Sequence, residues 1–202
     1  MMKLLAAGLS PYVRKVRITA KVKGLDGQIH LLSSDSANAA ELRARNPLGK
    51  IPILFLEDGT ALYDSHVICE YLDAQVATPV LFPGEGHKRW QMLTQAAIAD
   101  GILDAALLVV YEERYRPKEM RVQSWLDMQQ AKIDTALAIL EAAPPAWQDY
   151  PDYSHITIAS ALGYLDIRQE GAWREKSPHL VKWLEAFRIA VPAFDETSPP
   201  DT

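Results

Sequence analysis

The chain lacks the pair of cysteines, the metal-ligand spacings and the long apolar run that would build a disulfide, a zinc site or a membrane anchor. Its 202 residues contain one cysteine, Cys69, so no disulfide can form within the chain. No spacing of Cys and His residues predicts zinc binding, and no glycine-rich loop predicts a phosphate site. No uninterrupted apolar run approaches the roughly 20 residues that cross a bilayer. We therefore expect no metal and no membrane partner.

Acidic residues outnumber basic ones, and the formal net charge is -5. This balance disfavours a nucleic-acid partner or an anionic membrane surface. A small basic cluster, Arg14, Lys15 and Arg17, is interpreted as a solvated helix face. The first residues lack the long apolar segment of a secretory signal. We expect a cytoplasmic protein.

The N-terminal part predicts alternating strands and helices. Strands are expected at 3–6, 28–32, 53–56 and 61–63, and helices at 11–23, 37–45 and 66–73. Asp58-Gly59 predicts a hairpin with a type I′ turn, which needs positive φ at both central residues. A right-handed β-α-β crossover followed by this hairpin gives a four-stranded mixed sheet with helices on its faces.

The pattern changes after residue 75. Prolines and glycines between Thr78 and Gly86 indicate a linker over residues 76–86. From residue 87 to 202 only helical patterns follow, at 90–115, from Pro117 to 140, at 152–168 and from Pro178 to 187. The predicted fold class is an α/β domain over residues 1–75, followed by an all-α domain over residues 87–202.

Five segments form a recognisable series along nearly the whole chain: residues 10–17, 46–54, 63–72, 99–105 and 163–166. Together and in this order they resemble segments of the cytosolic glutathione S-transferases. The resemblance implies a thioredoxin-like N-terminal domain, a helical C-terminal domain, a homodimer and glutathione as co-substrate. It also implies a bacterial-type member with serine at the catalytic position.

Ser10 is the candidate catalytic residue. It is a favourable N-cap, and Pro11 suits the first helical position. The resemblance implies that its hydroxyl, at a helix N-terminus, stabilises the thiolate of glutathione. The alternative is an ordinary N-cap serine. Tyr12 lies in the first helical turn and is interpreted as lining the second-substrate site or as packing.

Two further segments are candidates for binding glutathione. If the Ile51–Pro52 bond is cis, the backbone of Ile51 turns outward, and the resemblance implies pairing with the cysteinyl part. Asp64 or Ser65 can cap the next helix. The resemblance implies that the two residues recognise the glutamyl group of glutathione. Its carboxylate would lie at the helix N-terminus and its ammonium at Asp64. Flanking candidates for the glycyl carboxylate are Lys50 and His66.

In the helical domain, the candidates for the second-substrate pocket are Asp104, Tyr111 and Trp173. The resemblance also implies that Asp100 or Asp104 reaches the glutamyl amine across a dimer interface. One departure from the family pattern concerns the start of the helix at 152. The family places a carboxylate three residues after the cap, whereas here Asp152 is followed by His155. We expect Asp152 to cap, and His155 not to make the return bond.

These residues predict a glutathione transferase of a detoxifying type, in which the thiolate attacks a small, largely apolar electrophile. The alternatives are a non-catalytic glutathione-binding or protein-interaction member of the fold, and a glutathione-dependent isomerase or lyase. Thiol exchange is disfavoured, because Ser10 stands where redox-active relatives carry cysteine and a hydroxyl cannot form the mixed disulfide. Cys69 is expected to be a small buried hydrophobe.

Overall fold

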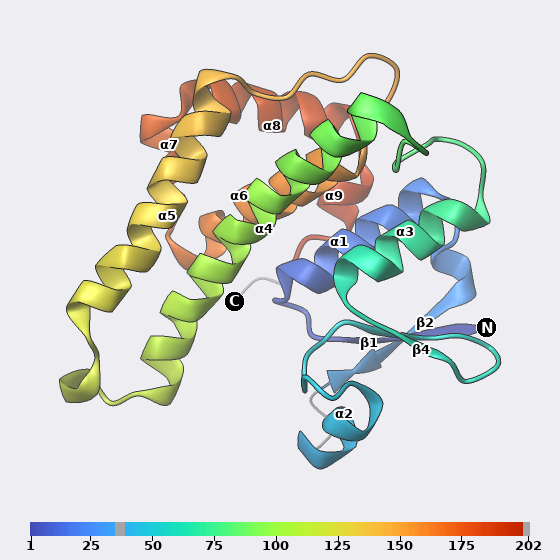
Figure 1. The fold of residues 1–202 in the computed structure, drawn as a ribbon, viewed down its shortest axis with the longest axis horizontal. Helices are drawn as coiled ribbons and strands as arrows, with labels where there is room; N and C mark the ends of the chain where they lie inside the picture. The colour runs from blue at the N-terminus through green and yellow to red at the C-terminus, as the bar shows by residue number, and fades with distance from the viewer. Residues whose placement is uncertain (35–38, 200–202) are drawn as a thin grey trace. The chain divides into compact units, whose positions relative to one another are not determined.

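The computed structural model describes residues 1–34 and 39–199, and the chain forms two compact units. The first unit contains Met1–Pro83 together with the segment from Val191 onward, and the second contains Gly84–Ala190. Figure 1 shows the course of the chain. Residues 37 and 38, predicted to begin the second helix, lie outside the described residues.

The first unit is built on a four-stranded sheet in the order β2-β1-β3-β4. The strands are β1 (Met2–Ala6), β2 (Ile29–Ser33), β3 (Ile53–Phe55) and β4 (Ala61–Leu62). β1 pairs in parallel with β2 and antiparallel with β3, which pairs antiparallel with β4. Helices α1 (Pro11–Val22) and α3 (Ser65–Gln75) pack together on one face, and α2 (Ala39–Arg45) lies on the other (Figure 1). The predicted fold class is confirmed.

The turn of the β3–β4 hairpin differs from the prediction. The N–H of Gly59 donates to the carbonyl of Leu56 at 3.1 Å, and the N–H of Leu56 donates to Thr60 at 2.8 Å. Gly59 has φ 88°, whereas Asp58 has no positive φ. This is a three-residue loop with a type I turn and a glycine bulge, which needs positive φ at one position only. The Asp58 carboxylate accepts the Thr60 N–H at 2.8 Å, which supports that geometry. The prediction of a type I′ turn was wrong.

The C-terminal segment packs on the first unit through α9 (Ala193–Glu196), which contacts α1. Arg14 donates to the carbonyl of Phe194 at 2.8 Å, and its guanidinium lies 3.9 Å from the centre of the Phe194 ring. The second unit therefore ends at Ala190, short of residue 202, because this last segment has its partners on α1. Arg14 and Lys15 are 6% and 1% exposed, so the prediction of a solvated basic face was wrong for both.

The segment predicted as a linker is attached to the first unit up to Pro83. The carboxylate of Asp73 accepts the N–H groups of Leu81 and Phe82, each at 3.0 Å. It also pairs with Nζ of Lys23 at 2.8 Å, and this buried ammonium donates to the carbonyl of Pro79 at 2.6 Å. Burial of Leu81 and Phe82 completes the attachment.

The second unit is helical in all its regular structure. Its helices are α4 (Gly86–Tyr115), α5 (Gln123–Ala142), α6 (Tyr153–Arg168), α7 (Trp173–Lys176) and α8 (Pro178–Ala190), with a 3₁₀ turn at Lys118–Met120. Helix α6 is buried from Tyr153 to Leu165, and α4 packs against both α5 and α6. By length and composition alone α4 is apolar enough to cross a membrane. Its apolar middle nevertheless carries Asp100 and Asp104.

The helix expected from Pro117 begins six residues later, at Gln123. Buried Glu112 stabilises the connection between α4 and α5. Its carboxylate accepts hydrogen bonds from Nε of Arg116 at 2.8 Å and from the Val122 N–H at 3.4 Å. Arg121 adds a bond to the carbonyl of Glu113 at 3.0 Å. These side-chain bonds stabilise a tight turn where periodicity predicted a helix.

The start of α6 also differs from the prediction. The carboxylate of Asp152 accepts the N–H groups of Ser154 and His155 at 2.9 and 3.4 Å. The N–H of Asp152 donates back to Nδ1 of His155 at 3.1 Å. Both halves of the capping box are therefore present in this geometry. The same Nδ1 lies 2.6 Å from the Asp152 carboxylate, so it accepts from the backbone N–H when it is unprotonated and donates to the carboxylate when it carries the proton. The ring of His155 is held by stacking on Trp183, with ring centres 6.1 Å apart.

Candidate functional site

The sheet topology brings three candidate segments to one edge. β1 ends at Ala6 and leads to Ser10. β3 is antiparallel to β1, and its first residue, Ile53, lies opposite Leu5, so the Ile51–Pro52 segment begins beside the end of β1. β4 is antiparallel to β3, so it ends at the same edge and leads into α3 (Figure 1). Ser10, Pro52 and Asp64 therefore share the carboxyl edge of β1.

Ser10 is the N-cap of α1, as one of its two interpretations expected. Its Oγ accepts the Val13 N–H at 3.3 Å, and its carbonyl accepts the Arg14 N–H at 3.0 Å. Within residues 1–34 and 39–199, no hydrogen bond uses its hydroxyl proton. The side chain is half-buried and stands at the positive end of the helix dipole. Capping as an acceptor thus leaves Ser10 able to donate to an anion.

The Ile51–Pro52 peptide bond is cis. No hydrogen bond to the described residues engages the N–H or C=O of Ile51. Buried Asn46 shapes the preceding loop: its Nδ2 donates to the carbonyl of Lys50 at 2.9 Å, and its Oδ1 accepts the Leu48 N–H at 3.0 Å. This role of Asn46 was not predicted. Asn followed by Pro and Gly is a turn signal that points to it.

Asp64 and Ser65 stand at the start of α3. The Tyr63–Asp64 peptide bond is cis. Asp64 is the N-cap, and its Oδ1 accepts the N–H groups of His66 and Val67 at 3.0 and 3.5 Å. Ser65 is buried, and its hydroxyl has no hydrogen-bond partner in the part of the chain that the structure describes. Asp64 therefore supports the helix end, and the Ser65 hydroxyl has a free hydrogen-bonding capacity there.

The two flanking candidates differ in their surroundings. The side chain of Lys50 is exposed. The ring of His66 packs edge-on against Phe82, with ring centres 5.5 Å apart, and its Nε2 lies 3.8 Å from the carboxylate of Glu70. His66 thus has contacts of its own within the first unit.

The candidates for the second-substrate pocket fall in different units. Tyr12, in the first unit, is half-buried, and Nζ of Lys15 lies 5.4 Å from its ring centre. Asp104 and Tyr111, on α4, are exposed and two helical turns apart, on one face. Tyr111 packs edge-on against Tyr115, with ring centres 5.3 Å apart.

Trp173 is buried at the start of α7. Its indole N–H donates to Asp166 at 2.9 Å, and Arg174 holds the same carboxylate by two bonds, of 2.8 and 2.7 Å. These contacts anchor α7 to the end of α6, so Trp173 has a supporting role within the second unit.

An aromatic and a basic side chain near the end of α6 interact in a way that was not predicted. Tyr164 is buried, and the guanidinium of Arg168 lies 5.6 Å from its ring centre. Burial raises the pKa of Tyr164, while the positive charge of Arg168 opposes that rise. Tyr111 and Arg114 of α4, a helix that packs against α6, also act electrostatically on the pKa of Tyr164.

Cys69 lies fully buried on α3, as expected of a small hydrophobe. Among residues 1–34 and 39–199, no three His, Cys, Asp or Glu side chains are grouped as a metal site would require.

Comparison with known proteins identifies the family. Models of the N-terminal and C-terminal domains of glutathione S-transferase match residues 9–75 and 123–186. The uncharacterized GST-like protein YibF of Escherichia coli K12 is 34% identical, over 98% of this chain and 99% of its own. The chain belongs to the glutathione S-transferase family.

Solved glutathione S-transferases share the whole fold. A family member from Pseudomonas fluorescens Pf-5, with bound glutathione, superposes with a TM-score of 0.91 at 41% identity and covers 100% of both chains. A glutathione S-transferase from Methylobacillus flagellatus, also with glutathione bound, has a TM-score of 0.90 at 33% identity, over 99% of this chain and 100% of its own. The matched N-terminal model spans every candidate residue of the first unit, from Ser10 to His66.

Proposed function

We propose that this glutathione S-transferase binds glutathione at the carboxyl edge of β1 and stabilises its thiolate with the Ser10 hydroxyl. The observation that carries the proposal is the state of Ser10. Its oxygen caps α1 while its proton is uncommitted within the described residues. Donation of that proton to sulfur, at the positive end of α1, favours the thiolate over the thiol.

The same edge offers complementary groups for the rest of the tripeptide. The backbone of Ile51 is free, among described residues, to pair with the cysteinyl peptide. The Ser65 hydroxyl and the N–H groups at the start of α3 suit the glutamyl carboxylate, and Asp64 suits its ammonium. Lys50 and His66 are assigned to the glycyl carboxylate. Glutathione bound in the Pseudomonas and Methylobacillus structures supports glutathione as the ligand.

The reaction we propose is attack of the glutathione sulfur on a small, largely apolar electrophile. A carbon–sulfur bond forms as the leaving group departs with its electron pair. A second Pseudomonas fluorescens structure, 40% identical with a TM-score of 0.87, holds S-(propanoic acid)-glutathione, a thioether of the kind such an attack produces. We assign Tyr12, Asp104 and Tyr111 to binding of the electrophile. Trp173 is assigned to supporting the second-substrate pocket.

The assembly and location that go with this function are proposals as well. We propose a cytoplasmic homodimer in which Asp100 or Asp104 of α4 approaches the glutamyl amine of the partner's glutathione. Conjugation of reactive apolar compounds in this setting is a detoxifying activity.

Calorimetric titration of the full chain with glutathione tests the binding part. Ser65→Ala removes one hydroxyl at the start of α3, and the matched control Ser124→Ala removes an exposed hydroxyl on α5. We expect Ser65→Ala to weaken binding about tenfold, as loss of a hydrogen bond to a charged group does, and Ser124→Ala to leave it unchanged. Absence of binding at millimolar glutathione would rule out the proposed function.

A second candidate is a member that binds glutathione without transferring it. The capping bond of Ser10 favours it, because that bond alone explains a serine at this position. Turnover of Ser10→Ala separates the two candidates, since binding and catalysis are separable. A glutathione-dependent isomerase or lyase would need the same thiolate, and a screen of substrates distinguishes it.

A further inference from the structure

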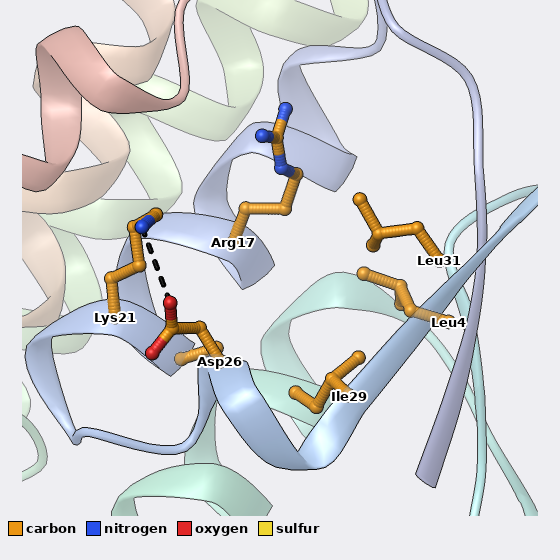
Figure 2. A pocket seen from close by; sticks show the side chains of 7 residues that line it. Leu4, Arg17, Lys21, Asp26, Ile29 and Leu31 are labelled. Atoms are coloured by element: carbon orange, nitrogen blue, oxygen red, sulfur yellow. Dashed lines mark hydrogen bonds and ion pairs between the residues drawn. The ribbon is translucent and has the colours of Figure 1, made fainter.

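The first unit has a pocket of about 160 Å³ at the opposite end of α1 from Ser10. It lies between the second half of α1 and the outer strand β2, as Figure 2 shows. The residues that line it are Leu4, Arg17, Ala20, Lys21, Asp26, Ile29 and Leu31. Arg17 is seven residues beyond Ser10, or about 10 Å along the helix. The pocket is therefore separate from the proposed thiolate site.

The floor of this pocket is apolar because of strand register. Leu4 of β1 and Leu31 of β2 are paired in the parallel ladder and project from the same face. Ile29 lies two residues before Leu31, so it projects from that face too. In Figure 2 the branched ends of Leu4 and Leu31 point from the sheet toward α1. β2 is an edge strand, and Leu31 is 48% exposed, so the pocket is open to solvent on that side.

The charges around the pocket are unevenly matched. Nζ of Lys21 lies 3.2 Å from the carboxylate of Asp26 and 2.9 Å from that of Glu196. Hydrogen bonds to Glu196 and Asp26 raise the pKa of Lys21, so its charge is held by two acids. Arg17, half-buried at the other side, has no hydrogen bond or ion pair with any described residue. Its guanidinium is the cation left to meet an anion.

We propose that this pocket binds a small aromatic carboxylate of the size of benzoate. A cavity of about 150 Å³ lined by aliphatic side chains holds a benzene ring, and this pocket of about 160 Å³, open to solvent at one side, has room for one such ring over its apolar floor. The carboxylate then meets Arg17, whose planar guanidinium binds such a group by two parallel hydrogen bonds. The aromatic ring and the carboxylate of the ligand are thus recognised by different walls of one pocket. This site takes no part in the proposed reaction of glutathione.

Fluorine NMR of para-fluorobenzoate, titrated with the full chain, tests the proposal. We expect a Kd of about 1 mM, as suits a ligand with so few atoms. Arg17→Met keeps the aliphatic stem and removes the charge, and it is expected to weaken binding about tenfold or more. The uncharged analogue para-fluorobenzamide should bind the wild-type chain more weakly than para-fluorobenzoate does, by a similar factor. The matched control Arg188→Met, at an exposed site on α8, should bind as the wild type does.

Saturating glutathione separates this site from the proposed thiolate site. We expect no displacement of para-fluorobenzoate by glutathione, and Arg17→Met should bind glutathione normally. A second variant, Leu31→Asp, places a negative charge at the exposed rim and should abolish binding of the acid; circular dichroism checks that both variants fold. The proposal is overturned by displacement with glutathione, by equal binding to wild type and Arg17→Met, or by no binding at roughly 10 mM, about ten times the expected Kd.

Discussion

Helix α1 of the first unit and helix α6 of the second both begin at a side-chain cap. At Ser10 the cap consists of one bond to a backbone N–H, and the hydroxyl proton has no partner among the described residues. At Asp152 the carboxylate takes two backbone N–H groups and the Ser154 hydroxyl, while His155 returns a bond to the backbone. The two helix starts share a local geometry and differ in what they leave unsatisfied.

The difference indicates how one capping device serves two purposes. A cap whose hydrogen bonds are all made within the chain stabilises the helix and has little to offer a ligand. A cap with an unused donor also stabilises its helix, and it presents that donor together with the helix dipole. Asp64 and Ser65 at the start of α3 divide these tasks, because Asp64 caps and Ser65 keeps its hydroxyl without a partner in the described chain.

The largest effect is expected from Ser10→Ala. Loss of a hydrogen-bond donor that stabilises a reacting anion, here the Ser10 hydroxyl and the glutathione thiolate, reduces turnover about 100-fold. We expect kcat/KM with glutathione and chlorodinitrobenzene to fall by that factor, and glutathione affinity to stay within a few fold. Ser10→Thr keeps the hydroxyl and the cap, so it should retain most of the activity. Unchanged turnover in Ser10→Ala would mean that Ser10 is a cap only.

The second effect concerns stability at the start of α6. Asp152→Ala removes the capping acceptor and leaves partly buried groups without partners, so we expect a loss of about 2 kcal/mol in the free energy of unfolding. Asp64→Ala, at an exposed cap, should lose about 1 kcal/mol. Urea unfolding measures both. The expected contrast between the caps of α3 and α6 would be contradicted if Asp64→Ala lowered the free energy of unfolding more than Asp152→Ala does.

The third test is the pH dependence of that stability. Burial disfavours the charged form of Asp152, but donation from the protonated Nδ1 of His155, together with the Ser154 hydroxyl and the His155 N–H, outweighs it, so the pKa of Asp152 lies below the ordinary value. Its contribution is therefore complete above the unfolded pKa of about 3.9 and is lost as pH falls through the folded pKa. We expect wild type to be more stable than Asp152→Asn near neutral pH, and the two urea midpoints to converge in acid. A difference that stays constant down to about pH 3 would contradict this assignment.

The smallest effect on stability is expected from Ser65→Ala. Because the hydroxyl has no hydrogen-bond partner in the described residues, its removal should change the free energy of unfolding by less than about 0.5 kcal/mol. The same variant should lose glutathione affinity, so one substitution separates binding from stability. A loss of more than about 1 kcal/mol in thermal or urea unfolding would show that Ser65 is a structural residue.

Most of the N-terminal unit could be predicted from local sequence. Pro11 after Ser10 indicates a helix start, and Asp58-Gly59 indicates a hairpin, because these residues restrict their own backbone. The turn type was wrong because loop length depends on the register of β3 and β4, which the dipeptide does not encode. The cis form of Ile51–Pro52 was left open by the sequence and is settled by the structure.

Charge and aromatic contacts were harder to predict. Arg14 was assigned to a solvated face, yet it binds Phe194, 180 residues away along the chain. The beginning of α5 was misplaced because Glu112 and Arg121 stabilise a turn through contacts that periodicity does not register. Trp173 is an aromatic residue with a polar N–H, and only the structure shows that Asp166 takes this donor.

The sequence by itself determined the order of the elements, the two-part organisation of strands followed by helices, and the short motifs at Ser10, Ile51-Pro52 and Asp64-Ser65. Each of these rests on interactions between residues close in the chain. Tertiary structure decided which hydrogen-bonding groups remain unused, and it made the pocket beside Arg17. These properties depend on which distant segments meet, because a donor is free or satisfied only with respect to every atom that packs around it.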